Sequence, residues 1–104
     1  MIPKILHSLL EQLHLPVTES GTAQALSLIK DKNPELGILL QSLIQADESH
    51  RFIRNDYELR HKLKDIWTFQ CNRTKSELEN YMQLLADYCQ NNDLKLPEEE
   101  SIQI

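Results

Sequence analysis

Glycine, proline and cysteine are scarce in this chain of 104 residues, which has two Gly, four Pro and two Cys. Gly and Pro are the residues that most disfavour the interior of a helix, so few positions interrupt one. Leu, Gln, Glu and Lys, which favour helices, are abundant. The composition therefore predicts an all-α fold, and the length is that of one domain.

Long apolar runs are also missing. The longest uncharged apolar stretch, residues 36–46, is far shorter than the ~20 residues that a membrane-spanning helix needs. The N-terminal residues have neither the apolar core nor the small-residue cleavage site of a signal peptide. We therefore expect no membrane insertion and a cytoplasmic location.

The two cysteines, Cys71 and Cys89, lie 18 positions apart in what is predicted to be one helix. At a rise of ~1.5 Å per residue they would be ~27 Å apart, which is too far for a disulfide. Two reduced, partly buried thiols are expected, which also fits a cytoplasmic protein. No His lies within a turn of Cys71, so a structural thiol is favoured over a nucleophile.

An excess of positive charge is absent, because the formal net charge is −5. Phosphate binding requires a basic field, so a general nucleic-acid binder is not expected. One segment is rich in basic residues despite the negative net charge, and it carries the side chains Arg51, Arg54, Arg60, His61, Lys62 and Lys64. It fits either a local nucleic-acid surface or a solvated helix face of mixed charge, and we favour the second.

The stretch from about residue 33 to residue 90 organises the chain. Asn33 is a suitable N-cap, and Pro34 is tolerated at the first helical position. Residues 55–58, Asn-Asp-Tyr-Glu, resemble a second capping signal. The stretch is therefore either one long helix or a hairpin that breaks near residues 54–56, and we favour the break.

Two shorter helices are expected before this stretch. Residues 2–14 repeat apolar side chains with the spacing of an amphipathic helix, which Pro16 ends. A second helix over about residues 22–32 begins at Ser20 or Thr22, since either is a suitable N-cap. The sequence thus predicts a small helical bundle or helical hairpin of three to four helices with a long C-terminal helix.

The predicted helical domain covers residues 1–92. Residues 93–104 are acidic and are predicted to form a flexible tail, or alternatively a short partner-docking strand that uses its Leu and Ile side chains. Within the domain, the apolar positions assigned to the core are Leu6, Leu10, Leu13, Leu39, Leu40, Leu43 and Ile66.

Candidate catalytic and metal-binding side chains form no complete site. His7, Glu11 and His14 share one face of the first helix, but no further ligand completes a zinc shell. His50 and His61 have carboxylates nearby in sequence, but no activated nucleophile, oxyanion donor or phosphate loop accompanies them. We therefore predict no enzyme activity, no cofactor and no metal.

The last helix carries the strongest indication of a binding surface. Its apolar and small side chains recur at three- and four-residue steps, as in a coiled-coil seam. Trp67 and Phe69 are two positions apart and face different directions, so one of them should be exposed. Exposed aromatic side chains often mark interfaces. The predicted partner-binding stripe, taken to be exposed, comprises Trp67, Phe69, Cys71, Thr74, Leu78, Tyr81 and Leu85.

Three segments in order carry a family resemblance: LSLIKDK at residues 26–32, ELGILLQSL at 35–43, and Asp47-Glu48 followed by Arg51. With the closing segment from residue 63 to Leu85, they resemble the flagellar export chaperones of the FlgN/FliT type. The resemblance implies an all-α fold with a long hairpin and no catalytic residues. It also implies a cytoplasmic role in holding the helical end of a secretion substrate.

These observations predict a non-enzymatic protein-binding module. It would be an adaptor or secretion-type chaperone that presents a groove to an amphipathic helix of a partner protein. One alternative is a homodimer that uses the same stripe as its own interface. Another is an acidic inhibitor or anti-activator that masks a basic partner, for which binding should be strongly salt-sensitive.

Overall fold

The computed structural model describes residues 2–16 and 21–97, and within them the chain forms five helices and no strand. The helices are α1 (Ile2–Gln12), α2 (Thr22–Lys32), α3 (Pro34–Arg54), α4 (Tyr57–Lys62) and α5 (Lys64–Asn91). The predicted all-α fold with a long C-terminal helix is confirmed. There is one more helix than the three to four expected, because the connection between the two long helices coils into the short α4.

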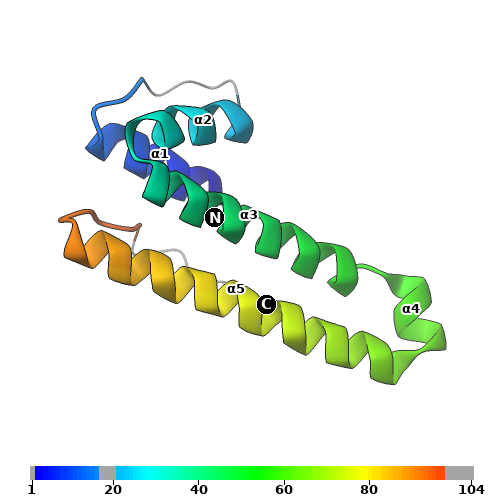
Figure 1. The fold of residues 1–104 in the computed structure, drawn as a ribbon. Coiled ribbons are helices and arrows are strands. Elements are labelled where there is room, and N and C mark those ends of the chain that lie inside the picture. The colour runs from blue at the N-terminus through cyan, green and yellow to red at the C-terminus, as the bar shows by residue number, and fades with distance from the viewer. Residues whose placement is uncertain (1, 17–20, 98–104) are drawn as a thin grey trace.

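A hairpin of α3 and α5 forms the long axis of the molecule, and α4 closes one end of it (Figure 1). The predicted break near residues 54–56 is confirmed. Asp56 is the N-cap of α4, and its carboxylate accepts a hydrogen bond of 3.0 Å from the backbone N–H of Leu59. The first N–H groups of a helix have no intrahelical acceptor, so this cap satisfies one of them and stabilises the turn.

The predicted start of the third helix is also confirmed. The Asn33 side chain accepts a 3.3 Å hydrogen bond from the Leu36 N–H, and Pro34 occupies the first turn. The start of α2 differs from the prediction, because its N-cap is Gly21, which makes no side-chain cap hydrogen bond. Thr22 is instead the first residue of that helix, and Ser20 lies outside the described residues.

Helices α1 and α2 pack against the open end of the hairpin, opposite α4 (Figure 1). The chain turns sharply from α2 into α3, and an added Cβ at Gly37 would lie 2.6 Å from the Lys30 Cα. Gly37 thus permits the close approach of the two helices. The buried side chains form one core at this end and along the hairpin: Ile5, Leu6, Leu9, Leu10, Ala25, Ile29, Leu36, Leu40, Leu43, Ala46, Leu78, Leu85 and Cys89.

The predicted core is largely confirmed. Leu6, Leu10, Leu40 and Leu43 are buried, and Leu13 and Leu39 are partly buried against the same core. The assignment of Ile66 is wrong, because its side chain is 50% exposed. Ile66 lies in the first turn of α5, far from the part of the hairpin that α1 and α2 cover.

The segment after α5 turns back onto α1. The Gln12 side-chain amide donates to the Lys95 carbonyl and accepts from the Lys95 N–H, both at 2.7 Å. Leu94 and Leu96 are partly buried against the core. Residues 93–97, predicted as the start of a flexible tail, therefore belong to the packed domain, whereas the rest of that tail, residues 98–104, lies outside the described residues.

The described part of the chain is elongated, with extents of 49 × 28 × 24 Å. Among the helices described, none combines the length and the apolar character required to cross a bilayer.

Candidate protein-binding surface at the hairpin tip

The predicted partner-binding stripe is not a single exposed surface. Thr74, Leu78 and Leu85 are buried within the chain, so their expected exposure is wrong. Leu78 and Leu85 belong to the same core as the apolar residues of α3, which covers this face of α5 inside one molecule.

The other members of the stripe lie at the edges of that contact. Trp67, Cys71 and Tyr81 are half-buried, and among the seven residues, all of which the structure describes, Phe69 alone is exposed, at 65%. The stripe is therefore mainly the seam that joins α5 to α3, and its outward part is confined to the start of α5.

Exposed apolar side chains gather instead at the end of the hairpin closed by α4. Five large ones there define what we call the tip surface: Phe52, Tyr57, Leu63, Ile66 and Phe69. They come from the last turn of α3, from α4 and its junction with α5, and from the first two turns of α5. Among the described residues, only Ile38 and Leu84 are comparable elsewhere. Aromatic and aliphatic exposure concentrated at one place marks an interaction surface more often than scattered exposure does.

Sequence analysis found only Phe69 among these five residues. It assigned Ile66 to the core and did not single out Phe52, Tyr57 or Leu63. The signal that could have found them is the capping sequence at residues 55–58. A turn at that place leaves the adjoining helix ends with few neighbours to cover their apolar side chains.

Trp67 holds the three segments of the tip together. Its indole Nε1–H donates a 2.9 Å hydrogen bond to the Ile53 carbonyl near the end of α3. The Arg60 guanidinium of α4 lies 5.1 Å from the centroid of its ring, which is a favourable cation–π distance. Because Trp67 contacts both neighbouring helices, the tip surface has a defined shape before any partner arrives.

Charged side chains surround the apolar side chains of the tip. Arg51 pairs with Asp47 at 2.5 Å, and Lys62 pairs with Glu58 at 2.8 Å. Both pairs join residues four apart on one helix, and the Lys62–Glu58 pair is fully on the surface, so it contributes little to stability, whereas Asp47 is mostly buried beside the exposed Arg51. Their role is to keep the surroundings of the tip polar and hydrated.

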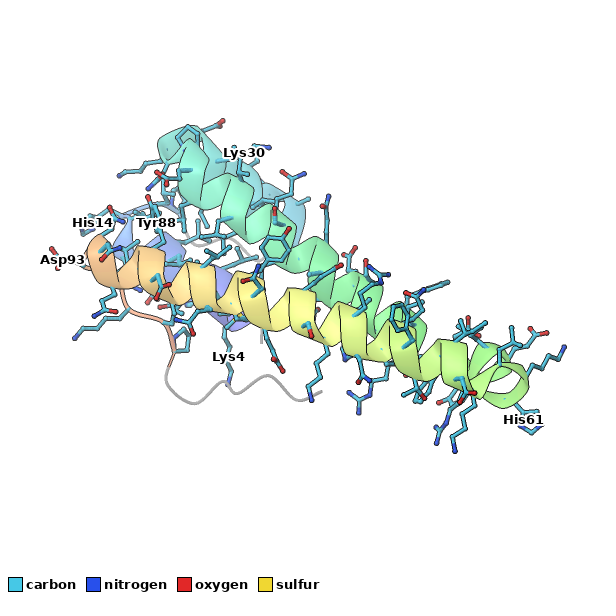
Figure 2. The ribbon with its side chains drawn as sticks, turned by 60° about the horizontal axis from the view of Figure 1, so that its bottom comes forward. Lys4, His14, Lys30, His61, Tyr88 and Asp93 are labelled. Atoms are coloured by element: carbon cyan, nitrogen blue, oxygen red, sulfur yellow. The ribbon has the colours of Figure 1, made fainter. Side chains whose placement is uncertain are left out.

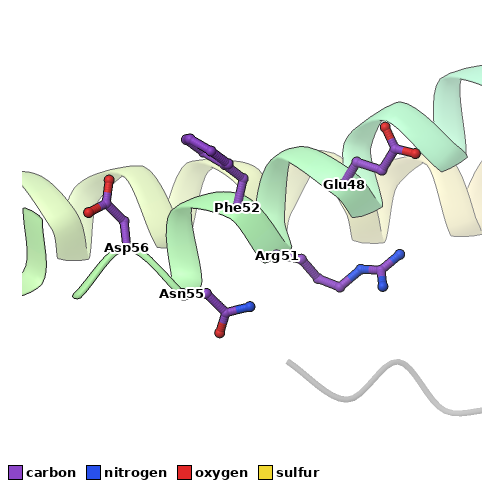
Figure 3. A pocket seen from close by; sticks show the side chains of 5 residues that line it. All are labelled: Glu48, Arg51, Phe52, Asn55 and Asp56. Atoms are coloured by element: carbon purple, nitrogen blue, oxygen red, sulfur yellow. The ribbon is translucent and has the colours of Figure 1, made fainter. Parts of the chain in front are cut away.

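A hollow of about 710 Å³ adjoins the tip and is lined by Glu48, Arg51, Phe52, Asn55 and Asp56. Figure 3 shows that these side chains do not converge on one point, since Arg51 and Asn55 extend away from Phe52. A small-molecule site generally surrounds its ligand with converging groups. The hollow is therefore more typical of an uneven protein-binding surface than of a small-molecule pocket.

His50, one of the two His residues considered for acid–base chemistry, lies buried between α3 and α5. Its Nδ1 is 2.8 Å from the Thr74 Oγ1, and that hydroxyl is also 3.0 Å from the Gln70 carbonyl and 3.1 Å from the Cys71 carbonyl. The hydroxyl is thus engaged within its own helix. His61 lies on the exposed surface of α4, so the fold does not bring the two His residues together.

Burial determines the protonation of His50. Within the described residues, its Nε2 is buried and has no hydrogen-bond partner. Desolvation lowers the pKa of His50 below 6.5, and the positive charges of Arg54 and Lys75 lower it further, against the opposing effect of Asp47. The imidazole is therefore neutral at pH 7, which is the form that a buried, unpaired nitrogen requires.

The remaining candidate ligands and thiols are also dispersed. His7 Nε2 lies 3.1 Å from Glu11 Oε1 on the exposed face of α1, and over residues 2–16 and 21–97 no three His, Cys, Asp or Glu side chains are grouped as metal ligands would be. Cys71 and Cys89 are both free. Burial raises the pKa of each thiol, although the charges of Arg54 and Arg60 partly offset this at Cys71.

Comparisons with known proteins were made at the level of families, of individual chains and of folds. No family model, no curated protein and no solved structure matches this chain. The likeness to flagellar export chaperones thus remains a prediction from the sequence segments described above.

Proposed function

We propose that this chain is a non-enzymatic protein-binding module and that the tip surface is its binding site. The observation that carries the proposal is the concentration of five exposed large apolar side chains at the end of the hairpin. Aromatic side chains of this kind, once enclosed by a partner, are the usual source of binding energy at protein interfaces.

The construction of the tip supports the same proposal. Trp67 fixes α4 against α3 and α5 through its hydrogen bond and its contact with Arg60. A surface that is ordered in the free protein loses less conformational entropy when it binds. In the adaptor or chaperone role predicted from the sequence, the tip therefore replaces the buried stripe as the surface offered to a partner helix.

Site-specific photo-crosslinking tests the proposal. A photoreactive phenylalanine analogue is placed at Phe69 in the tip, or at Gln45, an exposed position in the middle of α3. Irradiation in the cells that naturally make the chain should give a discrete protein adduct from position 69 and none from position 45. Equal adducts from both positions, or none from position 69, would contradict a binding site at the tip.

The mass of the adduct separates the possible roles. An adduct of this chain with another protein identifies an adaptor or chaperone and its partner. An adduct of two copies of this chain identifies self-association through the tip.

The acidic inhibitor remains a second candidate, and one observation favours it. Residues 76–93, the second half of α5 and the two residues after it, contain four acidic side chains and no Lys, Arg or His. A basic partner bound at this face rather than at the tip would crosslink from Gln83 and would dissociate as the salt concentration rises.

A further inference from the structure

The buried layers of the α3–α5 hairpin end in a polar pair on the side of the tip. Ala46 of α3 and Leu78 of α5 are the last buried apolar residues in that direction. His50 and Thr74, one turn further along each helix, are the last buried residues of any kind. No residue from 51 to 73, all of which the structure describes, is buried. The His50–Thr74 pair therefore forms the boundary between the shared core and the tip.

Beyond this boundary the hairpin is held together without buried side chains. Figure 2 shows this part, with His61 at its end, extending away from the part that carries Tyr88. A hollow of about 430 Å³ adjoins Thr74 and is lined by side chains of both α3 and α5, so the two helices do not pack tightly there. The hydrogen bond of Trp67 and its contact with Arg60 hold the tip instead. Separation of the helices at the tip can thus leave the core intact while it brings water to the boundary.

The hydrogen bonds of the polar pair decide where a proton would enter. The Thr74 hydroxyl lies 3.0 Å from the Gln70 carbonyl and 3.1 Å from the Cys71 carbonyl, so its single proton is donated within α5. Its oxygen then accepts from the Nδ1–H of His50 at 2.8 Å. The lone pair of the neutral ring is therefore on Nε2, which is buried and has no partner among the described residues. A proton added there creates a buried charge whose N–H has no acceptor.

The charged groups around His50 also disfavour its protonation. Arg54 of α3 and Lys75 of α5 are positive and lower its pKa, and the carboxylate of Asp47 acts in the opposite direction. That carboxylate is itself paired with an arginine of its own helix. The nearby thiol of Cys71 is neutral at pH 7, because burial raises its pKa. An imidazolium at this place is therefore compensated only by a carboxylate that it would share.

From these contacts we infer that His50 is an acid-sensitive switch, whose protonation separates α3 from α5 beyond Ala46 and Leu78 and opens the tip while the core stays folded. In the open tip the imidazole is hydrated and has its ordinary pKa of about 6.5, whereas in the closed tip its pKa is lower. Acidification therefore favours the open form. Since α3, α4 and α5 each supply part of the tip surface, opening also takes that surface apart. The switch operates in the free chain, whether or not the tip binds another protein.

Hydrogen exchange of the backbone amides at pH 7.5 and pH 5, corrected for the intrinsic exchange rate at each pH, tests the inference. At both pH values the amides of residues 51–73 should be less protected than those of residues 36–46 and 78–89, because the tip opens without the core. Between the two pH values the protection of residues 51–73 should fall by about tenfold. The fall is at most about 30-fold, because an open form with a pKa of 6.5 gains no more than tenfold per pH unit.

Variants of His50 assign the effect to this side chain. His50→Leu has no titratable nitrogen, so the protection of residues 51–73 should be the same at both pH values. His50→Gln, which is polar but does not titrate, takes its place if circular dichroism shows that His50→Leu does not fold. His61→Gln, on the exposed surface of α4, is the matched control and should keep the wild-type loss.

Three results would overturn the inference. Protection of residues 51–73 that is equal at both pH values would mean that the tip opens with His50 still buried. A loss that persists in the His50 variants would mean that another group takes up the proton. Equal protection of residues 51–73 and of the core amides would mean that the tip opens only when the whole chain unfolds. None of these results bears on the crosslink from Phe69, which tests the proposed function separately.

Discussion

His50 and Thr74 are the two buried polar side chains in the described part of the chain, and His50 is the one that can carry a charge. It is 4% exposed, one ring nitrogen lies within hydrogen-bond distance of the Thr74 hydroxyl, and the other has no partner within the described structure. A buried polar atom without a partner reduces stability, and a charge at that place would reduce it much more. The neutral imidazole is therefore a condition for close packing of α3 against α5.

The pH dependence of stability should report this residue. The pKa of His50 is lowered in the folded chain, so as the pH falls the unfolded chain takes up the proton first. The stabilising contribution is complete above pH 6.5 and is lost progressively as the pH falls below that value towards the folded-state pKa. Urea unfolding at a series of pH values between 7.5 and 5 measures the effect.

A His50→Leu variant should show a smaller loss of unfolding free energy over that range than the wild type. His61→Gln, which alters an exposed His of α4, is the matched control and should keep the wild-type dependence. If the free energy of unfolding falls equally with pH in the wild type and in His50→Leu, His50 does not determine the pH dependence of stability.

At the scale of the helix, adjacent residues of α5 have opposite surroundings. Leu85 is 0% exposed and Leu84 is 45% exposed. Leu85→Ala should lower the free energy of unfolding by about 2–5 kcal/mol, because it removes buried methyl groups and leaves a cavity. Leu84→Ala should change it by less than about 0.5 kcal/mol at a protein concentration low enough to keep the chain monomeric.

Chemical denaturation of the two variants side by side makes the comparison, with helix propensity held equal because both replace Leu by Ala. A similar loss for both would show that α5 does not turn its Leu85 face towards α3.

Sequence reasoning located the helices well because their ends carry local signals. Asn33 and Pro34 begin α3, and Asp56 caps α4. Each of these signals acts within one turn, so it can be recognised without knowledge of the rest of the fold.

Whether the α5 stripe is covered by the same chain or by a partner could not be predicted from such local signals. Apolar steps of three and four residues, such as those at Leu78 and Leu85, are alike whether the covering helix belongs to the same chain or to a partner. In this fold the covering helix belongs to the same chain, because the turn at α4 brings α5 back along α3 and so buries the stripe inside the molecule. The same turn exposes Phe52, Ile66 and Phe69, which local patterns had not singled out as a group.

At the scale of the whole molecule, the end of α1 is joined to the segment that follows α5 through the contact between Gln12 and Lys95. Residues 93–97 add the partly buried Leu94 and Leu96 to the core. A chain that ends after Asn92 should therefore be less stable than one that ends after Pro97, by about 1–3 kcal/mol for the lost burial and hydrogen bonds.

Thermal unfolding of these two shortened chains isolates the docked segment, because both lack residues 98–104. A melting temperature of the shorter chain equal to that of the longer one would show that residues 93–97 contribute nothing to stability.

None of the residues of α4, all of which the structure describes, is buried. The two ends of the hairpin therefore differ in how much buried contact holds them together. The end covered by α1 and α2 shares one core, so its helices can separate only by unfolding together. The tip depends on Trp67, the Asp56 cap and surface ion pairs, so its last turns can open while the remainder stays folded. The contacts of Trp67 with Ile53 and Arg60 therefore keep the tip ordered in the free chain, and they are also the contacts whose loss would open the tip without unfolding the core.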